Sequence, residues 1–345
     1  MTLTAFDVAA RLGLDASYAS WLAKLEGLAP SAAHLALPSA EEAVTLLSRL
    51  GCPPRTAAES AASLPDPGVD PARWWLLERC HARLIATMGN PGAARGCWPQ
   101  LPAALGPAGS CFPIHLFLAT MPATLRWHQA HGIPEEVTWA TLADLGRHAE
   151  IQEAVTGRSG VDEPWWVTLH LRSIIFELGS LQYVTFNLGE GPEQPEPWIT
   201  DAQAHALGEG FRPGDPALSV HIPAGAALSP EHREASMALA SSFFATHFPV
   251  SKRRIAICSS WLLDDQLATF LSEESNIVSF QRSFEIVDGW TQADQAVLWF
   301  LFRRRGPDLD RLPEETSLQR AVAAHLRRGG HMRWRTGWRD LPGRP

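Results

Sequence analysis

The chain has 345 residues, 46% of them hydrophobic, and a formal net charge of −8. These values are typical of one or two folded domains and exclude an intrinsically disordered chain. The 37 acidic residues outnumber the 29 basic ones, which argues against a protein that coats nucleic acid, and no apolar run reaches the length of a membrane span. We therefore expect neither nucleic acid nor a membrane among its partners. The start of the chain lacks the basic segment of a secretory signal, which favours a cytoplasmic location.

The first part of the chain, residues 1–160, is predicted to be an all-helical domain. Apolar residues recur at helical spacing in several segments, among them 41–50 and 135–155. Glycine and proline in the segment 157–164 interrupt this pattern. We therefore expect a second domain to span residues 161–345.

The second part alternates strands and helices. Strands are predicted at 181–188, where the segment ends at Gly189, and at 217–222 and 254–260, and a helix that begins at Pro230, after its cap Ser229, connects the last two. Two strands joined by a helix are expected to be parallel neighbours in one sheet. The remaining elements are predicted to be a short helix at 264–271, a strand pair at 277–287 and 296–303, a helix capped by Thr316 and Gln319, and a closing strand at 331–338. The predicted fold class is α+β, with a helical domain followed by an α/β domain that has a mixed sheet.

The order strand, glycine-containing loop, helix, strand resembles the second half of the GNAT acyltransferase superfamily. The loop keeps the family's Gly-x-Ala at Gly225–Ala227, but Ile222 stands where most members have a polar residue. A closer resemblance is to bacterial two-domain acyltransferase-like proteins, in which a helical N-terminal domain precedes a GNAT-like domain with a splayed sheet. The segments that carry it are LADLGRHAE at 142–150, LGSLQY at 178–183, LSVHIP at 218–223, CSSWLLD at 258–264, SNIVSFQ at 275–281 and RWRTGW at 333–338.

The resemblance implies an N-acyltransferase. The donor would be acyl-CoA, or the pantetheine thioester of an acyl carrier protein, and the acceptor an amine or hydroxyl of a small molecule or peptide. The pyrophosphate of the donor is expected on the loop and the first turn of the helix, because free N–H groups and the helix dipole stabilise anions there. The residues expected to bind it are Pro223, Ala224, Gly225, Ala226, Ala227 and Ser229.

Transfer to an amine needs a base for the amine proton and a proton donor for the departing thiolate. His221, at the end of the strand before the loop, is the candidate base, and a buried structural histidine is the equal alternative. The superfamily often supplies the proton from a tyrosine on the helix after the second strand, but the segment 264–271 contains none. Ser259, Ser260, Tyr183 and water are the substitutes.

Two further functions stay open at this point. Cys258 lies on the strand expected beside that of His221, so a thiolate nucleophile oriented by Asp264 would make the protein a hydrolase or amidase. A cysteine in a central strand is also a common buried apolar residue. Ile222 and the missing tyrosine favour a catalytically silent ligand-binding or scaffold protein.

The candidate substrate-binding residues are Trp261, Asn276 and His170. Each also has a structural alternative. Trp261 would pack in the core, Asn276 would form a turn, and His170 would lie on the solvated face of an amphipathic segment. No metal is expected, because the cysteines form no CxxC pair and His128 and His131 have no nearby carboxylate that would complete a zinc site. The sequence leaves the oligomeric state open.

Overall fold

The computed structural model describes residues 3–28, 35–93, 98–189, 199–248, 255–306 and 308–342. The chain divides into two compact units, Met1–Phe176 and Glu177–Pro345. None of the helices in the described ranges has both the length and the hydropathy that a bilayer crossing requires.

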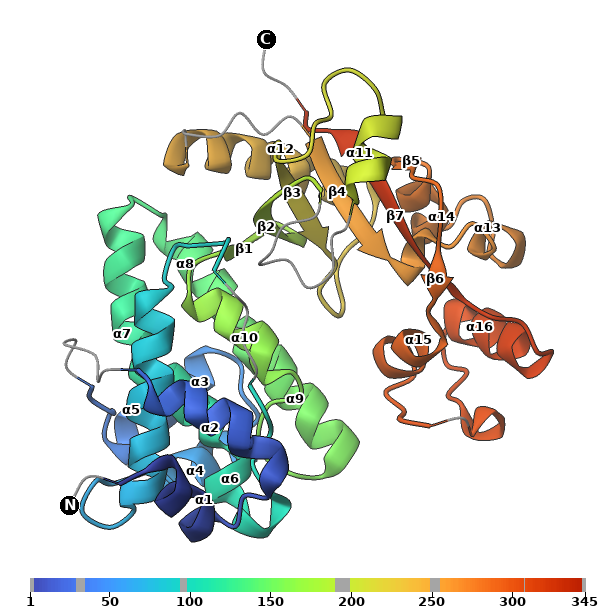
Figure 1. Ribbon diagram of the computed structural model, residues 1–345. Coiled ribbons are helices and arrows are strands. Elements are labelled where there is room, and N and C mark those ends of the chain that lie inside the picture. Colours follow the sequence, from blue (N-terminus) through green and yellow to red (C-terminus); the bar gives the residue numbers. More distant parts are fainter. Residues whose placement is uncertain are drawn as a thin grey trace. The chain divides into compact units, whose positions relative to one another are not determined.

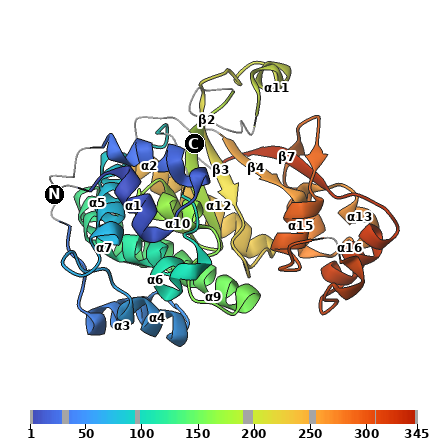
Figure 2. The ribbon, with the colours of Figure 1, turned by 60° about the horizontal axis from the view of Figure 1, so that its bottom comes forward.

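The first unit is helical (Figure 1). Its centre is the pair α5 and α7, whose Leu76, Leu84 and Phe117 are fully buried. α3 and α4 lie side by side at its edge (Figure 2). The helices are α1 (Ala5–Leu12), α2 (Ala19–Glu26), α3 (Ala40–Arg49), α4 (Pro54–Ala62), α5 (Pro71–Ala86), α6 (Pro107–Ser110), α7 (Phe112–Ala130), α8 (Glu135–Leu142), α9 (Asp144–Thr156) and α10 (Pro164–Leu171).

The boundary between the two units, after Phe176, lies later in the chain than the predicted domain boundary at residue 160. The helical spacing ends near residue 157, but α10 packs on α7, α8 and α9 and so adds a further helix to the first unit. The contacts of α10, rather than the glycine-rich segment before it, therefore determine that it belongs to the first unit.

The second unit is built on a mixed sheet with the strand order β1-β2-β3-β4-β7-β5, and β6 also pairs with β7 (Figure 1). β3 and β4 are parallel, as predicted, and β2 with β3 and β4 with β7 are antiparallel. The strands are β1 (Ile175–Leu178), β2 (Leu181–Asn187), β3 (Pro216–His221), β4 (Ile255–Ser260), β5 (Glu285–Ile286), β6 (Thr291–Gln292) and β7 (Arg333–Asp340).

Helices cover both faces of this sheet. On one face α12 (Pro230–His247) contacts β2, where the hydroxyls of Ser236 and Tyr183 lie 2.9 Å apart. On the other face α11 (Asp201–Ala206) contributes Ala204 to an apolar cluster with Ala217 and Ile257 of β3 and β4. The expected α+β class, with a helical first part and a mixed sheet in the second, is confirmed.

The predicted strand pair at 277–287 and 296–303 is wrong. These segments mainly form the helices α14 (Asn276–Gln281) and α15 (Asp294–Phe300). Ser275 caps α14 by accepting the N–H of Ile277. Val297 of α15 and Val322 of α16 (Ser317–Arg327) belong to one buried apolar cluster, and the two helices lie side by side in both views (Figure 1 and Figure 2). A short apolar run is compatible with the spacing of a helix and with that of a strand. The neighbouring segments of the folded chain therefore decided which of the two forms.

Candidate functional site

The parallel strands β3 and β4 separate at their carboxyl ends. Their ladder runs as far as the pair Val220–Cys258. Beyond that pair, His221 continues its pairing with Gln182 of β2, while Ser259 continues its pairing on the opposite side, with β7. Open α/β sheets bind ligands outside the carboxyl ends of such strands, so this separation is the candidate site.

A row of polar side chains crosses the sheet at this level. His221 and Ser259 each follow the last ladder pair by one residue, so both point away from the α12 face. Gln182 is paired with His221 and Thr336 with Ser259, which places all four on one face. The Gln182 amide donates to the carboxylate of Glu177 on β1, at 3.1 Å. We call these five residues the polar row.

His221 is half-buried at the end of β3. Its Nε2 lies 3.0 Å from the hydroxyl of Ser219, two residues earlier on the same face of the strand. This contact orients the ring, and imidazole is the side chain best suited to take a proton near neutral pH. The position predicted for the base is therefore at the strand separation.

The two neighbouring serines of β4 have different environments. The Ser259 hydroxyl accepts a hydrogen bond from Nε1 of Trp334 at 2.8 Å and lies 2.9 Å from the hydroxyl of Thr336. The Ser260 hydroxyl instead accepts the N–H of Leu262 at 3.1 Å and caps a short 3₁₀ turn. Ser260 therefore has a structural partner, whereas Ser259 belongs to the polar row.

Tyr183 and Cys258 lie in register with Val220, on the α12 face and away from the polar row. The Tyr183 side chain is fully buried, and burial raises the pKa of its phenol. Cys258 is 1% exposed, and burial raises the pKa of its thiol to about 12. The structure does not bring these two side chains together with His221, and it disfavours a thiolate at Cys258.

The loop at 223–227 leads from β3 into α12. Gly225 has φ 79°, a conformation that favours glycine, and a backbone hydrogen bond closes the turn. Ser229 caps α12 by accepting the N–H of His232, and its hydroxyl donates to Glu231 in the first turn. Ala224, Gly225 and Ala227 are exposed, so their backbone groups can be reached from solvent.

The candidates Trp261 and Asn276 have ordinary structural positions. Trp261 is 6% exposed and belongs to the apolar cluster of α15 and α16. Asn276 is an exposed first residue of α14, next to the cap Ser275. Asp264, expected to orient Cys258, is buried and accepts the backbone N–H of Arg333 at 2.7 Å.

His170 lies in the first unit, within a buried cluster formed by α9, α10 and the segment between them. Its Nε2 is 3.1 Å from Asp144, and Nε2 of His148 is 3.3 Å from the same carboxylate. Nδ1 of His148 is 2.5 Å from Asp162, and Nε of Arg147 is 2.7 Å from Asp144. We call Asp144, His148, Asp162 and His170 the α9–α10 charge cluster.

Near neutral pH, His148 of this cluster is positively charged and His170 is neutral. Burial opposes protonation of His148, but its hydrogen bonds to Asp144 and Asp162 outweigh it and raise the pKa to about 9. Burial lowers the pKa of His170 to about 4, although Asp144 opposes this shift. Burial would raise the pKa of Asp144, but the neighbouring histidines and Arg147 hold it below its ordinary value. The cluster therefore has the character of a structural ion-pair network.

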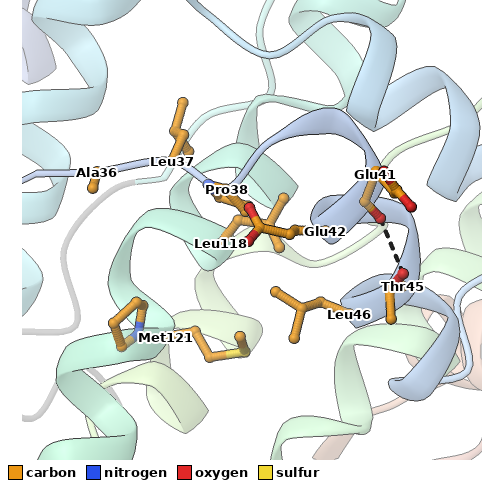
Figure 3. Close-up of a pocket in the computed structure, with 10 residues that line it drawn as sticks. Ala36, Leu37, Pro38, Glu41, Glu42, Thr45, Leu46, Leu118 and Met121 are labelled. Carbon is orange, nitrogen blue, oxygen red and sulfur yellow. Dashed lines mark hydrogen bonds between the residues drawn. The ribbon is translucent and has the colours of Figure 1, made fainter.

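A cavity of about 580 Å³ opens in the first unit beside the start of α3 (Figure 3). Its lining is mostly apolar, with Leu46 and Met121 among its residues, and its polar members are Glu41, Glu42 and Thr45. Glu42 accepts the N–H of the cap residue Ser39 at 2.8 Å, so it is part of the helix start. Across the described ranges, no group of three or more His, Cys, Asp and Glu side chains is arranged to hold a metal ion.

Sequence reasoning missed three members of this site, namely Gln182, Thr336 and Trp334. The sequence offered one indication of them, which is a polar residue such as Gln182 within a predicted strand. In the structure the Gln182 side chain is 1% exposed. A strand pattern tells which residues share a face but not which face meets the site.

Comparison with known proteins agrees with this architecture. Residues 175–339 match the GNAT-like C-terminal domain and residues 41–173 match the N-acyltransferase N-terminal domain. A mutant acyltransferase in complex with octanoyl-CoA is 38% identical, with a TM-score of 0.88 over 99% of this chain and 100% of that one. An acyltransferase in complex with decanoyl-CoA and teicoplanin is 39% identical, with the same coverage and a TM-score of 0.88. A third, in complex with CoA and 10C-Teicoplanin, is 38% identical over the same share of both chains, with a TM-score of 0.87.

None of the curated proteins matches the chain. The solved structures, however, are similar to it along nearly its whole length and at well above 30% identity. Both domains are matched in the order in which the structure places them. The chain therefore belongs to the family of N-acyltransferases that combine an N-acyltransferase N-terminal domain with a GNAT-like C-terminal domain.

Proposed function

We propose that this protein transfers an acyl group from acyl-CoA to an amine of a small-molecule or peptide acceptor, at the carboxyl ends of β3 and β4. The observation that supports this most is the polar row at the point where the two parallel strands separate. Relatives of the same architecture are bound to octanoyl-CoA and decanoyl-CoA, which supports an acyl-CoA with a medium-length chain as the donor.

The proposed reaction follows from the chemistry of the row. His221 takes a proton from the acceptor amine, whose lone pair attacks the thioester carbonyl. Backbone N–H groups that β3 and β4 no longer share beyond Val220–Cys258 stabilise the oxyanion. The carbon–sulfur bond then breaks, and the amide and CoA are released.

The loop at 223–227 and the first turn of α12 are the proposed site for the phosphates of the donor. Its proposed contacts are Pro223, Ala224, Gly225, Ala226, Ala227 and Ser229. An acyl carrier protein offers the same pantetheine thioester, so it is the alternative donor. Comparing acyl-CoA with the acyl carrier thioester at equal concentration distinguishes the two.

The acceptor is proposed to be a small molecule or peptide that carries a free amine. Relatives are bound to teicoplanin and 10C-Teicoplanin, which supports an acceptor of this kind. Asn276 and Trp261 are not part of this proposal, because one is exposed at a helix start and the other is packed in a core. His170 enters it only through the stability of the first unit.

The test measures CoA release and acylated product with octanoyl-CoA and decanoyl-CoA and a panel of amine acceptors that includes teicoplanin. His221→Ala should lower kcat by about 10²- to 10⁴-fold, because the base is lost. His205→Ala, an exposed histidine of α11, is the matched control and should behave as wild type. A wild-type protein that neither binds nor consumes any acyl-CoA would refute the proposal, and one that binds without turnover would favour the silent alternative.

A further inference from the structure

The hydroxyl of Ser259 accepts one hydrogen bond and makes a second contact in which either hydroxyl can be the donor. Trp334 Nε1 can only donate, so the Ser259 oxygen is the acceptor of that 2.8 Å bond. Thr336 can supply the hydrogen of the 2.9 Å contact between the two hydroxyls. With both of its lone pairs occupied in this way, Ser259 keeps its own hydrogen for a third group.

The place of Ser259 directs that hydrogen toward the strand separation. Ser259 follows the last ladder pair of β4 and shares its face with His221, on the strand that separates from β3. Thr336 and Trp334 lie on β7, on the other side of β4, and hold the oxygen from behind. The hydroxyl is thus held as an oriented donor.

The other hydroxyls considered for this site are engaged elsewhere. Ser260 follows Cys258 by two residues on β4 and so shares its face, away from the polar row, and Tyr183 is buried on that same α12 face beside Ser236. In the described part of the helical segment after β4, from Trp261 to Phe270, no tyrosine is present. Ser259 is therefore the hydroxyl that the fold directs at the site.

We propose that Ser259 donates a hydrogen bond to the sulfur of the departing CoA. This rests on the acyl-CoA-dependent function proposed above. When the tetrahedral intermediate collapses, the carbon–sulfur bond breaks and its electron pair goes to sulfur. Ser259 stabilises that thiolate, which then takes a proton from solvent, while the amine proton leaves through His221 to solvent. Ser259 itself is not deprotonated, so protons and charge balance over the reaction.

The sulfur is assigned in preference to the carbonyl oxygen for a specific reason. In the proposed function, backbone N–H groups at the strand separation stabilise the oxyanion, which leaves the Ser259 hydroxyl as the side-chain donor for the thiolate. A hydrogen bond to a charged group is worth more than one between neutral groups, so its loss is measurable.

The direct test titrates the thiol of CoA bound to the full-length protein, by the ultraviolet absorption of the thiolate. Bound to wild type, the thiol should ionise about 1 to 2 pH units lower than when bound to Ser259→Ala. Ser259→Thr keeps the hydroxyl and should restore the lower value. Ser283→Ala removes a hydroxyl that donates to Phe280 at 2.7 Å, and this matched control should titrate as wild type.

Kinetics provide the second measurement. Ser259→Ala should lower kcat with acyl-CoA by about 10- to 100-fold, with little change in KM and in the thermal unfolding midpoint. Equal thiol ionisation in wild type and Ser259→Ala, with CoA still bound, would overturn the role of Ser259 and leave the proposed function intact. Absence of CoA binding by wild type would instead refute the proposed function itself.

Discussion

Replacing His148 with glutamine should change both the stability of the protein and its dependence on pH. His148 lies between Asp144 and Asp162, and only 15% of its side chain is exposed. Glutamine keeps a polar side chain but cannot carry a positive charge. The two carboxylates would then lose the histidine's charge in a buried environment, which typically costs about 3 to 5 kcal/mol.

The magnitude and its direction follow from the pKa of His148. Hydrogen bonds to the two aspartates raise it to about 9 from its ordinary 6.5, against the opposing effect of burial. Each unit of pKa corresponds to about 1.4 kcal/mol, so the charged form contributes about 3 kcal/mol to folding. Because the pKa is raised on folding, this contribution is fully present below pH 6.5 and is lost as the pH rises through about 9. His170 behaves in the opposite sense, since its lowered pKa of about 4 weakens folding only on the acid side.

The assay is urea unfolding of wild type and His148→Gln, followed by tryptophan fluorescence at pH 7 and pH 10. The difference in unfolding free energy between the two proteins should shrink by about 3 kcal/mol at the higher pH. Other groups that titrate in this range do so in both proteins and cancel. His131→Gln, an exposed histidine of the same unit, is the control. A difference that is the same at both pH values would refute a charged His148 in this cluster.

Three further predictions concern single positions or pairs within one unit. Cys258→Ala should keep the wild-type kcat and lose about 1 kcal/mol of stability, and loss of activity in a folded variant would restore the thiol nucleophile. Gly146→Ala should destabilise the first unit by about 3 kcal/mol in thermal unfolding, because the new Cβ would lie 2.2 Å from the carbonyl oxygen of Leu50, and an unchanged midpoint would contradict this packing. Glu234 and Arg339 form a two-pronged ion pair at 2.8 and 2.9 Å; a double-mutant cycle should give a coupling of about 1 kcal/mol that salt reduces, and zero coupling would mean that the pair is not formed in solution.

Local signals in the sequence predicted much of the fold. Ser229 and Pro230 marked the start of α12, and Thr316 with Gln319 marked that of α16, because capping depends on residues within one turn. The helix between two strands predicted the parallel pair β3 and β4, because a crossover of this kind returns in the same direction. His221 was placed correctly at the end of β3, since strand ends are marked locally by proline and glycine.

Other features needed the partners of each segment. The strand pair expected at 277–287 and 296–303 is wrong because apolar residues of α15 join one buried cluster with those of the neighbouring helix α16. The sequence also did not show which face of the sheet carries the polar row and which is covered by α12. Alternation along a strand shows which residues share a face, but not what that face contacts.

The sequence by itself determined that the chain has a helical part, a mixed α/β part and a histidine where a loop follows a strand. The tertiary structure decided which side chains surround that histidine. It placed Tyr183 and Cys258 on the α12 face, and Ser259 rather than Ser260 in the polar row. The physical reason is that strand register and helix packing are set by contacts between distant segments, and a change of one residue in register moves a side chain from the core to the site.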